Sequence, residues 1–230
     1  MQAKVLLAAP INKRKAYILN EWLDYVNSLT YTNLTVLLVD NSDDKDWHKS
    51  IIAKGFDVIY HKPKGAPSKY ISESQNILRQ YALDYNFDYL FSLECDNFAT
   101  RDIVERLLSY HADNINVPYF LKLGTETTLG VQIDGIKQAG FTKYDVMPAI
   151  TNMVYFDGKL KTGIPSIGCS LFSKKLLSLQ EFRHDPNNVG IFSDSFWHMD
   201  SITNGITPIV VTDLISTHKR KPEWNQIKHS

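Results

Sequence analysis

The sequence predicts an α/β fold in which helices flank a mostly parallel sheet. Three observations support this prediction. Over the first 110 residues, short runs of β-prone residues alternate with segments whose apolar residues recur at helical spacing. Most residues of these runs are apolar, as in strands that are buried on both faces. Polar residues follow three of them directly. Parallel strands need crossover connections, and right-handed crossovers give a Rossmann-like sheet.

The first elements follow this alternation in order. A strand over 4–9 is stopped by Pro10, and a second strand covers 35–39. A short helix over 46–54 precedes a third strand over 56–60. Between the first two strands we expect a helix from Arg14, because apolar residues fall at helical spacing at Ile18, Trp22, Tyr25 and Leu29.

The next helix is expected to begin at Ser72. Ser72 and Gln75 have the spacing of a capping box, in which each side chain bonds to the other residue's backbone N–H. A fourth buried strand covers 89–93, and a helix follows from about Arg101.

The second part of the chain is less regular. Residues 113–165 are rich in glycine and proline, with a short strand over 153–156 before a turn, and we expect an irregular lobe there rather than a second domain. Regular structure returns over 166–179, with Ser173 as the N-cap of a helix. A helix from Ser193 ends at Gly205, and a last strand covers 206–211. We therefore expect one domain over 1–230.

Composition narrows the class of protein. Of 230 residues, 43% are hydrophobic, and 25 basic residues balance 25 acidic ones, so no global charge recruits nucleic acid or an anionic membrane. Two cysteines cannot form a disulfide framework, which favours a reducing compartment. No apolar run approaches the roughly 18 residues that span a bilayer, and the first residues lack a signal peptide. We expect a cytoplasmic protein without a transmembrane segment.

Polar residues cluster where three of the predicted strands end. The three groups are 10–12 (Pro-Ile-Asn), 40–42 (Asp-Asn-Ser) and 94–97 (Glu-Cys-Asp-Asn). Carboxyl ends of parallel strands share one edge of the sheet, which is where ligands bind in open α/β folds. Glu94 and Asp96 are two residues apart and project to the same side of an extended backbone. Two carboxylates with phosphate oxygens and water suit Mg²⁺ or Mn²⁺.

These features together resemble the GT-A fold of nucleotide-sugar-dependent glycosyltransferases, over most of the chain except 113–165. The segment Glu94-Cys95-Asp96 stands in the place of the metal-binding DxD motif. Asp40 matches the acidic residue that contacts the nucleoside at the end of the second strand. The segment from Gly65 to Asn76 is similar to the glycine-containing loop and helix of that group, with Gln75 where Arg is usual.

The resemblance extends into the second half. Residues 167–174 are similar to the glycine-containing acceptor-side strand and its short helix. Residues 192–197 resemble the segment whose acidic residue is the catalytic base of inverting members, which implies Asp194 here. The Glu that usually precedes it is missing, and Asp200 is the rival. Gly205 is followed thirteen residues later by His218, which matches the ending in which His completes the metal site.

The resemblance implies that 1–112 bind the nucleotide sugar and that 113–230 bind the acceptor and carry out catalysis. The metal ligands would be Asp96, Glu94 and His218, and Asp194 the base. The donor-binding residues would be Ala9, Pro10, Asn12, Asp40, Asn41, Gly65, Asn76, Arg79, Glu94, Cys95, Lys219 and Arg220.

The implied activity is metal-dependent transfer of a sugar from a UDP- or GDP-sugar to a hydroxyl group. Inversion is favoured and retention stays open. The acceptor classes are a glycan, a lipid-linked glycan, a protein or, least favoured because the net charge is zero, a modified nucleic-acid base.

Two other functions stay open. A nucleotidyltransferase would normally carry a glycine-rich loop after the first strand, where this chain has Ala9-Pro10-Ile11-Asn12-Lys13-Arg14 without glycine. The non-enzymatic alternative is a nucleotide- or glycan-binding module.

Overall fold

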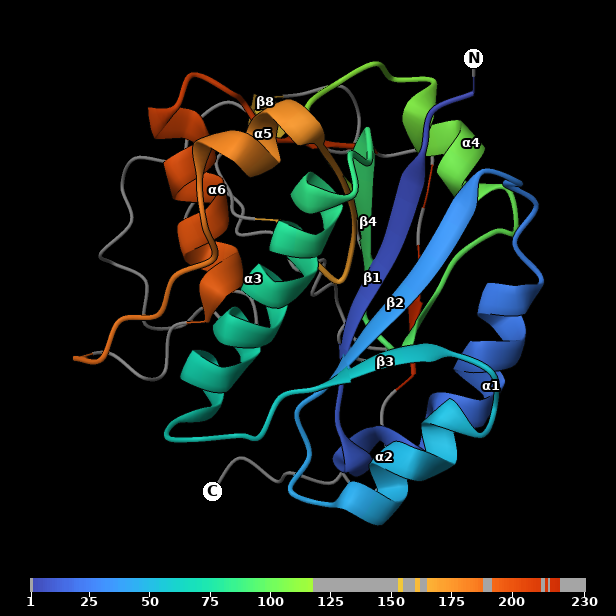
Figure 1. Ribbon diagram of the computed structural model, residues 1–230. Coiled ribbons are helices and arrows are strands. Elements are labelled where there is room, and N and C mark those ends of the chain that lie inside the picture. The colour runs from blue at the N-terminus through green and yellow to red at the C-terminus, as the bar shows by residue number, and fades with distance from the viewer. Residues whose placement is uncertain are drawn as a thin grey trace, which may run out of the picture.

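The computed structural model describes residues 2–117, 153–154, 160–161, 165–187, 192–211, 214 and 216–219. A seven-stranded sheet in the order β10-β6-β9-β4-β1-β2-β3 forms the centre of the molecule (Figure 1). Strand β9 runs antiparallel to both of its neighbours, and all other pairs in this sheet are parallel. The prediction of a mostly parallel, Rossmann-like sheet is therefore confirmed.

The first half alternates strands and helices as predicted. Its strands are β1 (Val5–Ile11), β2 (Leu34–Asp40), β3 (Asp57–Tyr60), β4 (Tyr89–Leu93) and β5 (Asn97–Phe98). The one-turn 3₁₀ helix η1 (Lys13–Lys15) leads into α1. The α-helices are α1 (Ala16–Asn27), α2 (Lys45–Ile52), α3 (Pro67–Asp84) and α4 (Ile103–Leu108).

The second half completes the sheet and adds two short ribbons. Its strands are β6 (Asn114–Asn116), β7 (Met153–Val154), β8 (Leu160–Lys161), β9 (Cys169–Ser173), β10 (Ile209–Val210) and β11 (Thr217–His218), and its helices are α5 (Lys174–Leu179) and α6 (Ser193–Thr203). Strand β11 pairs with β5, and β7 pairs with β8, both antiparallel.

The two faces of the sheet bury separate hydrophobic clusters. Side chains alternate along β1, so Val5 and Leu7 pack with residues of α1 and α4, whereas Leu6 and Ala8 pack with residues of α3 and α5. Figure 1 shows α3, α5 and α6 gathered over one side and α1 and α2 on the other. Because helices cover both faces, only the sheet's rim stays open for a ligand.

Two predicted boundaries are wrong for identifiable reasons. Helix α3 begins at Pro67 rather than at Ser72, because Pro67 occupies the first helical turn, where a missing N–H costs nothing. The Ser72 hydroxyl donates to Lys69 O inside the helix instead of capping it. The last sheet strand is only Ile209–Val210, shorter than predicted. Two caps are confirmed: Ser173 accepts a hydrogen bond from Leu176 N, and Gly205 follows α6 with φ +76°.

Strand β6 was not predicted, because it lies in the segment expected to be irregular. Asn is depleted in strands, yet Asn114 and Asn116 are both fully buried in the sheet. The other residues of the predicted lobe that fall in 118–152, 155–159 and 162–164 lie outside the described residues.

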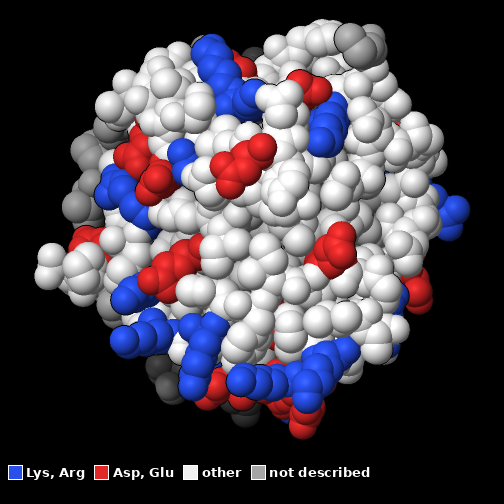
Figure 2. All heavy atoms as spheres, viewed as in Figure 1, with Lys and Arg blue, Asp and Glu red and all other residues white. Residues whose placement is uncertain are grey.

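The surface carries both signs of charge. Figure 2 shows acidic and basic side chains interspersed over one face, with the largest group of cations along its lower edge beside acidic groups. Among the described helices, none combines the length and the apolar character that crossing a membrane requires.

Candidate active site

A cleft of about 420 Å³ opens at the rim of the sheet, beside the ends of β1, β2 and β4. An adjacent hollow of about 450 Å³ shares four lining residues with the cleft, so the two are continuous. The shared residues are Asn12, Arg14, Asn41 and Tyr70. The described structure therefore has an opening at the predicted edge of the sheet.

A tight turn at the end of β4 presents the two carboxylates. Asn97 N donates to Glu94 O at 2.9 Å, and Glu94 N donates to Gly168 O of the neighbouring segment at 2.8 Å. Glu94 and Asp96 therefore reach the cleft through a turn and not, as expected, from an extended backbone. The functional expectation is unaffected, because both residues line the cleft.

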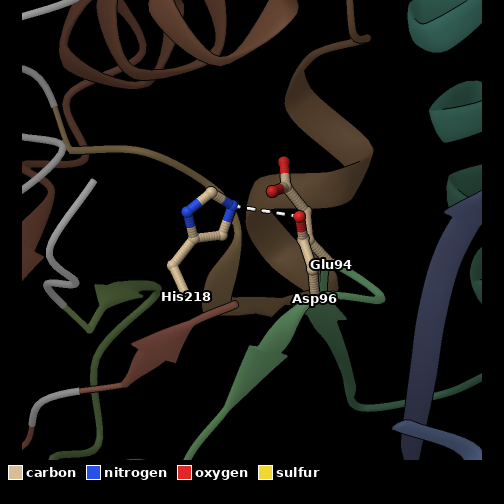
Figure 3. Close-up of side chains that lie close together, drawn as sticks. All are labelled: Glu94, Asp96 and His218. Carbon is tan, nitrogen blue, oxygen red and sulfur yellow. Dashed lines mark ion pairs between the residues drawn. The ribbon is translucent and has the colours of Figure 1, made fainter. Parts of the chain in front are cut away.

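His218 approaches Asp96 from the small β5/β11 ribbon. The pairing places His218 opposite Asn97, and Lys219 N donates to Asp96 O at 2.8 Å. His218 Nε2 then lies 3.1 Å from Asp96 Oδ2 (Figure 3). One candidate ligand atom from each of Glu94, Asp96 and His218 lies within 4.8 Å of the others. The structure thus brings together three residues that span more than half of the sequence.

Lys15 is the basic residue of this cluster, and sequence reasoning missed it. Its Nζ contacts Asp96 Oδ2, the oxygen that also faces His218. Burial opposes the charge on Lys15, but the carboxylates of Asp96 and Glu94 outweigh burial and raise its pKa above the ordinary value. The sequence feature that could have indicated Lys15 is the run of three basic residues at 13–15. This run follows the first strand and therefore lies at the same rim of the sheet as Glu94 and Asp96.

Burial and neighbouring charge push the two carboxyl groups in opposite directions. Burial raises the pKa of Glu94, and the charge on Asp96 raises it further. Burial also acts on Asp96, but the hydrogen bond from His218 and the charge on Lys15 outweigh it and lower its pKa. Asp96 is therefore the more firmly ionised of the pair, although its side chain is fully buried.

The cluster fits a divalent cation. Two carboxylates and an imidazole are ligands that Mn²⁺ and Mg²⁺ accept. Asp96 Oδ1 is buried and has no hydrogen-bond partner among the described residues, which leaves an oxygen without compensation for its lost hydration. A bound cation would supply that compensation.

Asp194, in the first turn of α6, also lines the cleft. Burial raises its pKa, against the lowering effect of a hydrogen bond from Ser195 N. The charge of Asp194 also contributes to the raised pKa of Glu94. Asp200 instead forms a two-point ion pair with Arg183, at 2.7 and 3.0 Å, and does not line the cleft.

A hydrogen-bonded loop joins the ends of β1 and β2. Asn12 Nδ2 donates to Asn41 O and to Asn41 Oδ1, while Asn12 Oδ1 accepts from Arg14 N. Lys13 N donates to Ser42 Oγ at 2.7 Å. Four of the predicted donor-binding residues, Pro10, Asn12, Asn41 and Cys95, line the cleft, whereas Ala9 is fully buried in the core.

Asp40 is buried beneath this loop and lines neither hollow. Its Oδ1 accepts from Ser42 N at 2.8 Å, and its Oδ2 lies 3.2 Å from His48 Nδ1. Burial raises the pKa of Asp40 despite these contacts. Asn41, itself almost fully buried, lines the cleft where Asp40 does not.

The predicted residues on α3 are engaged away from the cleft. Asn76 exchanges two hydrogen bonds with the backbone of Phe182, and Arg79 Nε donates to Leu177 O. Gly65 takes φ +87° in the turn before α3, a conformation that favours glycine, and it does not line the cleft. Helix α3 lines the cleft with Pro67, Tyr70, Ile71 and Gln75 instead. Gln75 Oε1 accepts a hydrogen bond from Ser193 Oγ.

The basic residues after His218 are placed only in part. The ammonium of Lys219 contacts Glu21 and lies 4.5 Å from the centre of the Phe98 ring, outside the cleft lining. Arg220 lies outside the described residues.

Known proteins resemble this chain in structure but not detectably in sequence. No protein-family model matches the chain, and no curated protein matches it. Solved structures match over almost the whole chain. TarS from S. aureus (residues 1–349, in complex with UDP-GlcNAc) superposes with a TM-score of 0.58 at 14% identity, covering 99% of this chain and 62% of that one.

Two further structures agree. The mannosyltransferase PcManGT from Pyrobaculum calidifontis, in complex with GDP-Man and Mn²⁺, matches with a TM-score of 0.58 at 15% identity, over 96% of this chain and 58% of that one. Glucosyl-3-phosphoglycerate synthase from Mycobacterium tuberculosis, in complex with Mn²⁺, UDP and glucosyl-3-phosphoglycerate, matches with a TM-score of 0.58 at 14% identity, over 96% and 74%.

These matches establish the fold. The chain spans about 60% of the length of the first two proteins, so it corresponds to part of each. Together with the mostly parallel sheet, they show that this chain has the GT-A fold.

Proposed function

We propose that this GT-A chain is a metal-dependent glycosyltransferase that moves a sugar from a UDP- or GDP-sugar to a hydroxyl acceptor. The observation that carries the proposal is the convergence of Glu94, Asp96 and His218 at the end of β4, beside the cleft. The structural neighbours crystallised with UDP-GlcNAc, or with GDP-Man and Mn²⁺, support the same donor chemistry.

The charges that develop during glycosyl transfer suggest a role for each group of residues in the site. Breaking the bond between sugar and phosphate leaves negative charge on the departing diphosphate and positive charge on the sugar ring. A divalent cation held by Asp96, Glu94 and His218 would stabilise the diphosphate when bound. The amide-lined loop at Asn12 and Asn41 would position the nucleotide in the adjoining hollow.

Asp194 is proposed as the base that takes the proton of the acceptor hydroxyl. It lines the same cleft as Glu94 and Asp96 and has a raised pKa. A carboxylate is a more effective base when its pKa approaches the working pH. This placement favours inversion, in which the acceptor attacks from the side opposite the leaving group. Asp200 is less suited, because Arg183 neutralises it outside the cleft.

The acceptor is proposed only as a hydroxyl compound. Phe192 is exposed at the cleft beside Asp194 and offers an apolar surface against which one face of a sugar ring packs. A glycan, a lipid-linked glycan or a glycosylated protein would each present such a ring.

The first experiment identifies the reaction. Purified protein is incubated with Mn²⁺ and a panel of UDP- and GDP-sugars, and free UDP or GDP is measured. Slow release of nucleoside diphosphate from one donor is the expected result. Pyrophosphate formed from a nucleoside triphosphate and a sugar phosphate would identify a nucleotidyltransferase instead, and binding without turnover would identify a binding module.

The second experiment separates the two carboxylates. Asp96→Asn is expected to abolish metal-dependent donor binding, whereas Asp194→Asn is expected to leave donor binding within about twofold and to lower transfer about 10³-fold. Calorimetry with UDP or GDP and Mn²⁺ measures binding, and initial rates measure transfer. Full transfer by Asp194→Asn would show that another group is the base.

A further inference from the structure

Lys15 occupies a position that the proposed metal site leaves unexplained. Its ammonium contacts Asp96 Oδ2, the same oxygen that lies 3.1 Å from His218 Nε2. Lys15 therefore contacts one of the carboxylates proposed as metal ligands. The side chain of Lys15 is 26% exposed, whereas that of Asp96 is fully buried.

The backbone fixes Lys15 in this place. Asn12 caps the 3₁₀ turn of Lys13–Lys15 by accepting a hydrogen bond from Arg14 N, and Lys15 N donates to Asn12 O at 2.8 Å. Asn12 is in turn held by two hydrogen bonds to Asn41. The root of the Lys15 side chain is thus anchored to the ends of β1 and β2, while its flexible stem reaches β4.

A fully buried carboxylate needs a nearby positive charge, because its hydration is lost. In the described structure the ammonium of Lys15 supplies that charge directly to Asp96. A divalent cation bound between Asp96, Glu94 and His218 would bring a second positive charge to the carboxylate group that the ammonium contacts. The two cations would repel each other there.

We propose that Lys15 is an internal counter-ion for the metal site: a divalent cation displaces its ammonium from Asp96, and the released ammonium then binds the diphosphate of the donor. The inference rests on the proposed function and adds a phosphate-binding residue to it. Lys15 already lines the cleft beside Asn12 and Arg14, so its ammonium reaches an anion there by rotating its stem.

The first test measures Mn²⁺ alone, without nucleotide, by calorimetry. Lys15→Met removes the charge and keeps most of the stem, so Mn²⁺ should bind about tenfold more tightly than to the wild type, because no ammonium competes for Asp96. Lys13→Met is the matched control. It removes the same charge from the same turn, but its ammonium pairs with Asp44, and the change in Mn²⁺ affinity should stay below about twofold.

Lys15→Arg provides a test in the opposite direction that keeps the positive charge. A guanidinium pairs with a carboxylate at two points, so Mn²⁺ should bind no more tightly than to the wild type. Tighter binding would overturn the proposal, and this result stands even if Lys15→Met folds poorly with Asp96 unpaired.

The second test uses inorganic pyrophosphate at saturating Mn²⁺. Lys15→Met should bind pyrophosphate about tenfold more weakly than the wild type, because the displaced ammonium is no longer available. The two halves of the proposal therefore predict opposite changes for one substitution. Unchanged or weaker Mn²⁺ affinity, or unchanged pyrophosphate affinity, would overturn it.

Asp96→Asn separates failure of this inference from failure of the proposed function. If Asp96→Asn abolishes Mn²⁺ binding while Lys15→Met leaves it unchanged, the metal site is correct and the counter-ion role is wrong. If Mn²⁺ affinity does not depend on Asp96 in any variant, the metal site itself is wrong.

Discussion

Two clusters of polar side chains, one partly buried and one fully buried, differ in how their charges and hydrogen bonds are satisfied. The first, the rim cluster, consists of Lys15, Glu94, Asp96 and His218 at the end of β4. The second, the internal network, lies between β6, β9 and α6. It consists of Asn114, Asn116, Ser170, His198 and Ser201.

The internal network is neutral, and its two amides are paired within the fold, whereas His198 Nε2 has no hydrogen-bond partner among the described residues. Asn116 Nδ2 donates to Asn114 Oδ1 and to Ile209 O, while Asn116 Oδ1 accepts from Ser170 Oγ. Asn114 Nδ2 donates to Ser201 Oγ, which donates to Ile206 O. These bonds repay the lost hydration of each amide and fix the pairing of β6 with its neighbours.

The rim cluster is charged and incompletely satisfied. Asp96 Oδ1 lacks a hydrogen-bond partner in the described part of the chain, and Glu94 has a raised pKa beside a second carboxylate. Such an arrangement lowers the stability of the fold, and proteins retain such a cost where it serves a function such as ligand binding. The contrast teaches that buried polarity serves structure where it is paired within the fold and serves ligand binding where it is left open.

The largest expected effect breaks the internal network. Asn116→Leu leaves Asn114 Oδ1 and Ile209 O without their donor, so the free energy of unfolding should fall by about 3 kcal/mol. Urea denaturation measures the change. Asn27→Leu on the exposed end of α1 is the control and should stay within about 0.5 kcal/mol. The Mn²⁺ affinity of folded Asn116→Leu should equal that of the wild type, and a loss would show that the two groups are coupled.

A smaller effect is expected from His198 in the internal network, as a change in the free energy of unfolding with pH. Burial lowers the pKa of His198 to about 3, whereas the unfolded chain binds a proton near the ordinary value of 6.5. The unfolded state therefore holds more protons between these values, and stability is lost as pH falls below 6.5. From pH 7 to pH 5 the wild type should lose about 2 kcal/mol more than His198→Gln. Urea denaturation at pH 7 and at pH 5 measures the free energy of unfolding of both proteins. If the wild type and His198→Gln lose the same amount between the two pH values, His198 is not a buried neutral imidazole.

The smallest effect has the opposite sign. The folded pKa of Glu94 is raised, so the stability that its protonated form provides at low pH is lost as pH rises through that value. Glu94→Gln should therefore stabilise the protein at pH 7 by about 1 kcal/mol while weakening Mn²⁺ binding. Thermal melting with and without Mn²⁺ measures both. A destabilised Glu94→Gln would mean that Glu94 serves the fold.

Much of the fold could be predicted because most of its buried strands are recognisable in the sequence. The buried strands β1, β2 and β4 are continuous apolar runs, and the polar residues at their ends mark the rim. Strand β6 could not be found in this way, since its buried residues are amides whose partners lie on β9 and α6. Only tertiary contacts make Asn114 and Asn116 suitable for a strand.

The candidate site was predictable to the extent that it depends on strand ends. Glu94, Asp96 and His218 converge as the resemblance implies, because the β5/β11 pairing brings the chain's later part to the end of β4. Which side of α3 lines the cleft was harder to predict. Asn76 and Arg79, which were expected to bind the donor, instead hydrogen-bond to the backbone of the segment after β9. Lys15 was missed because its direction depends on a single 3₁₀ turn.

The ribbon that carries His218 has a consequence for variants far from any ligand. Strand β11 is attached to β5 by two residues of pairing, and two residues are too few to be stable alone. Among the described residues, this short attachment and the hydrogen bond from Lys219 N to Asp96 O keep the imidazole near Asp96. A sequence change that loosens it, such as Thr217→Pro, would act as a metal-site mutation although it alters no coordinating atom.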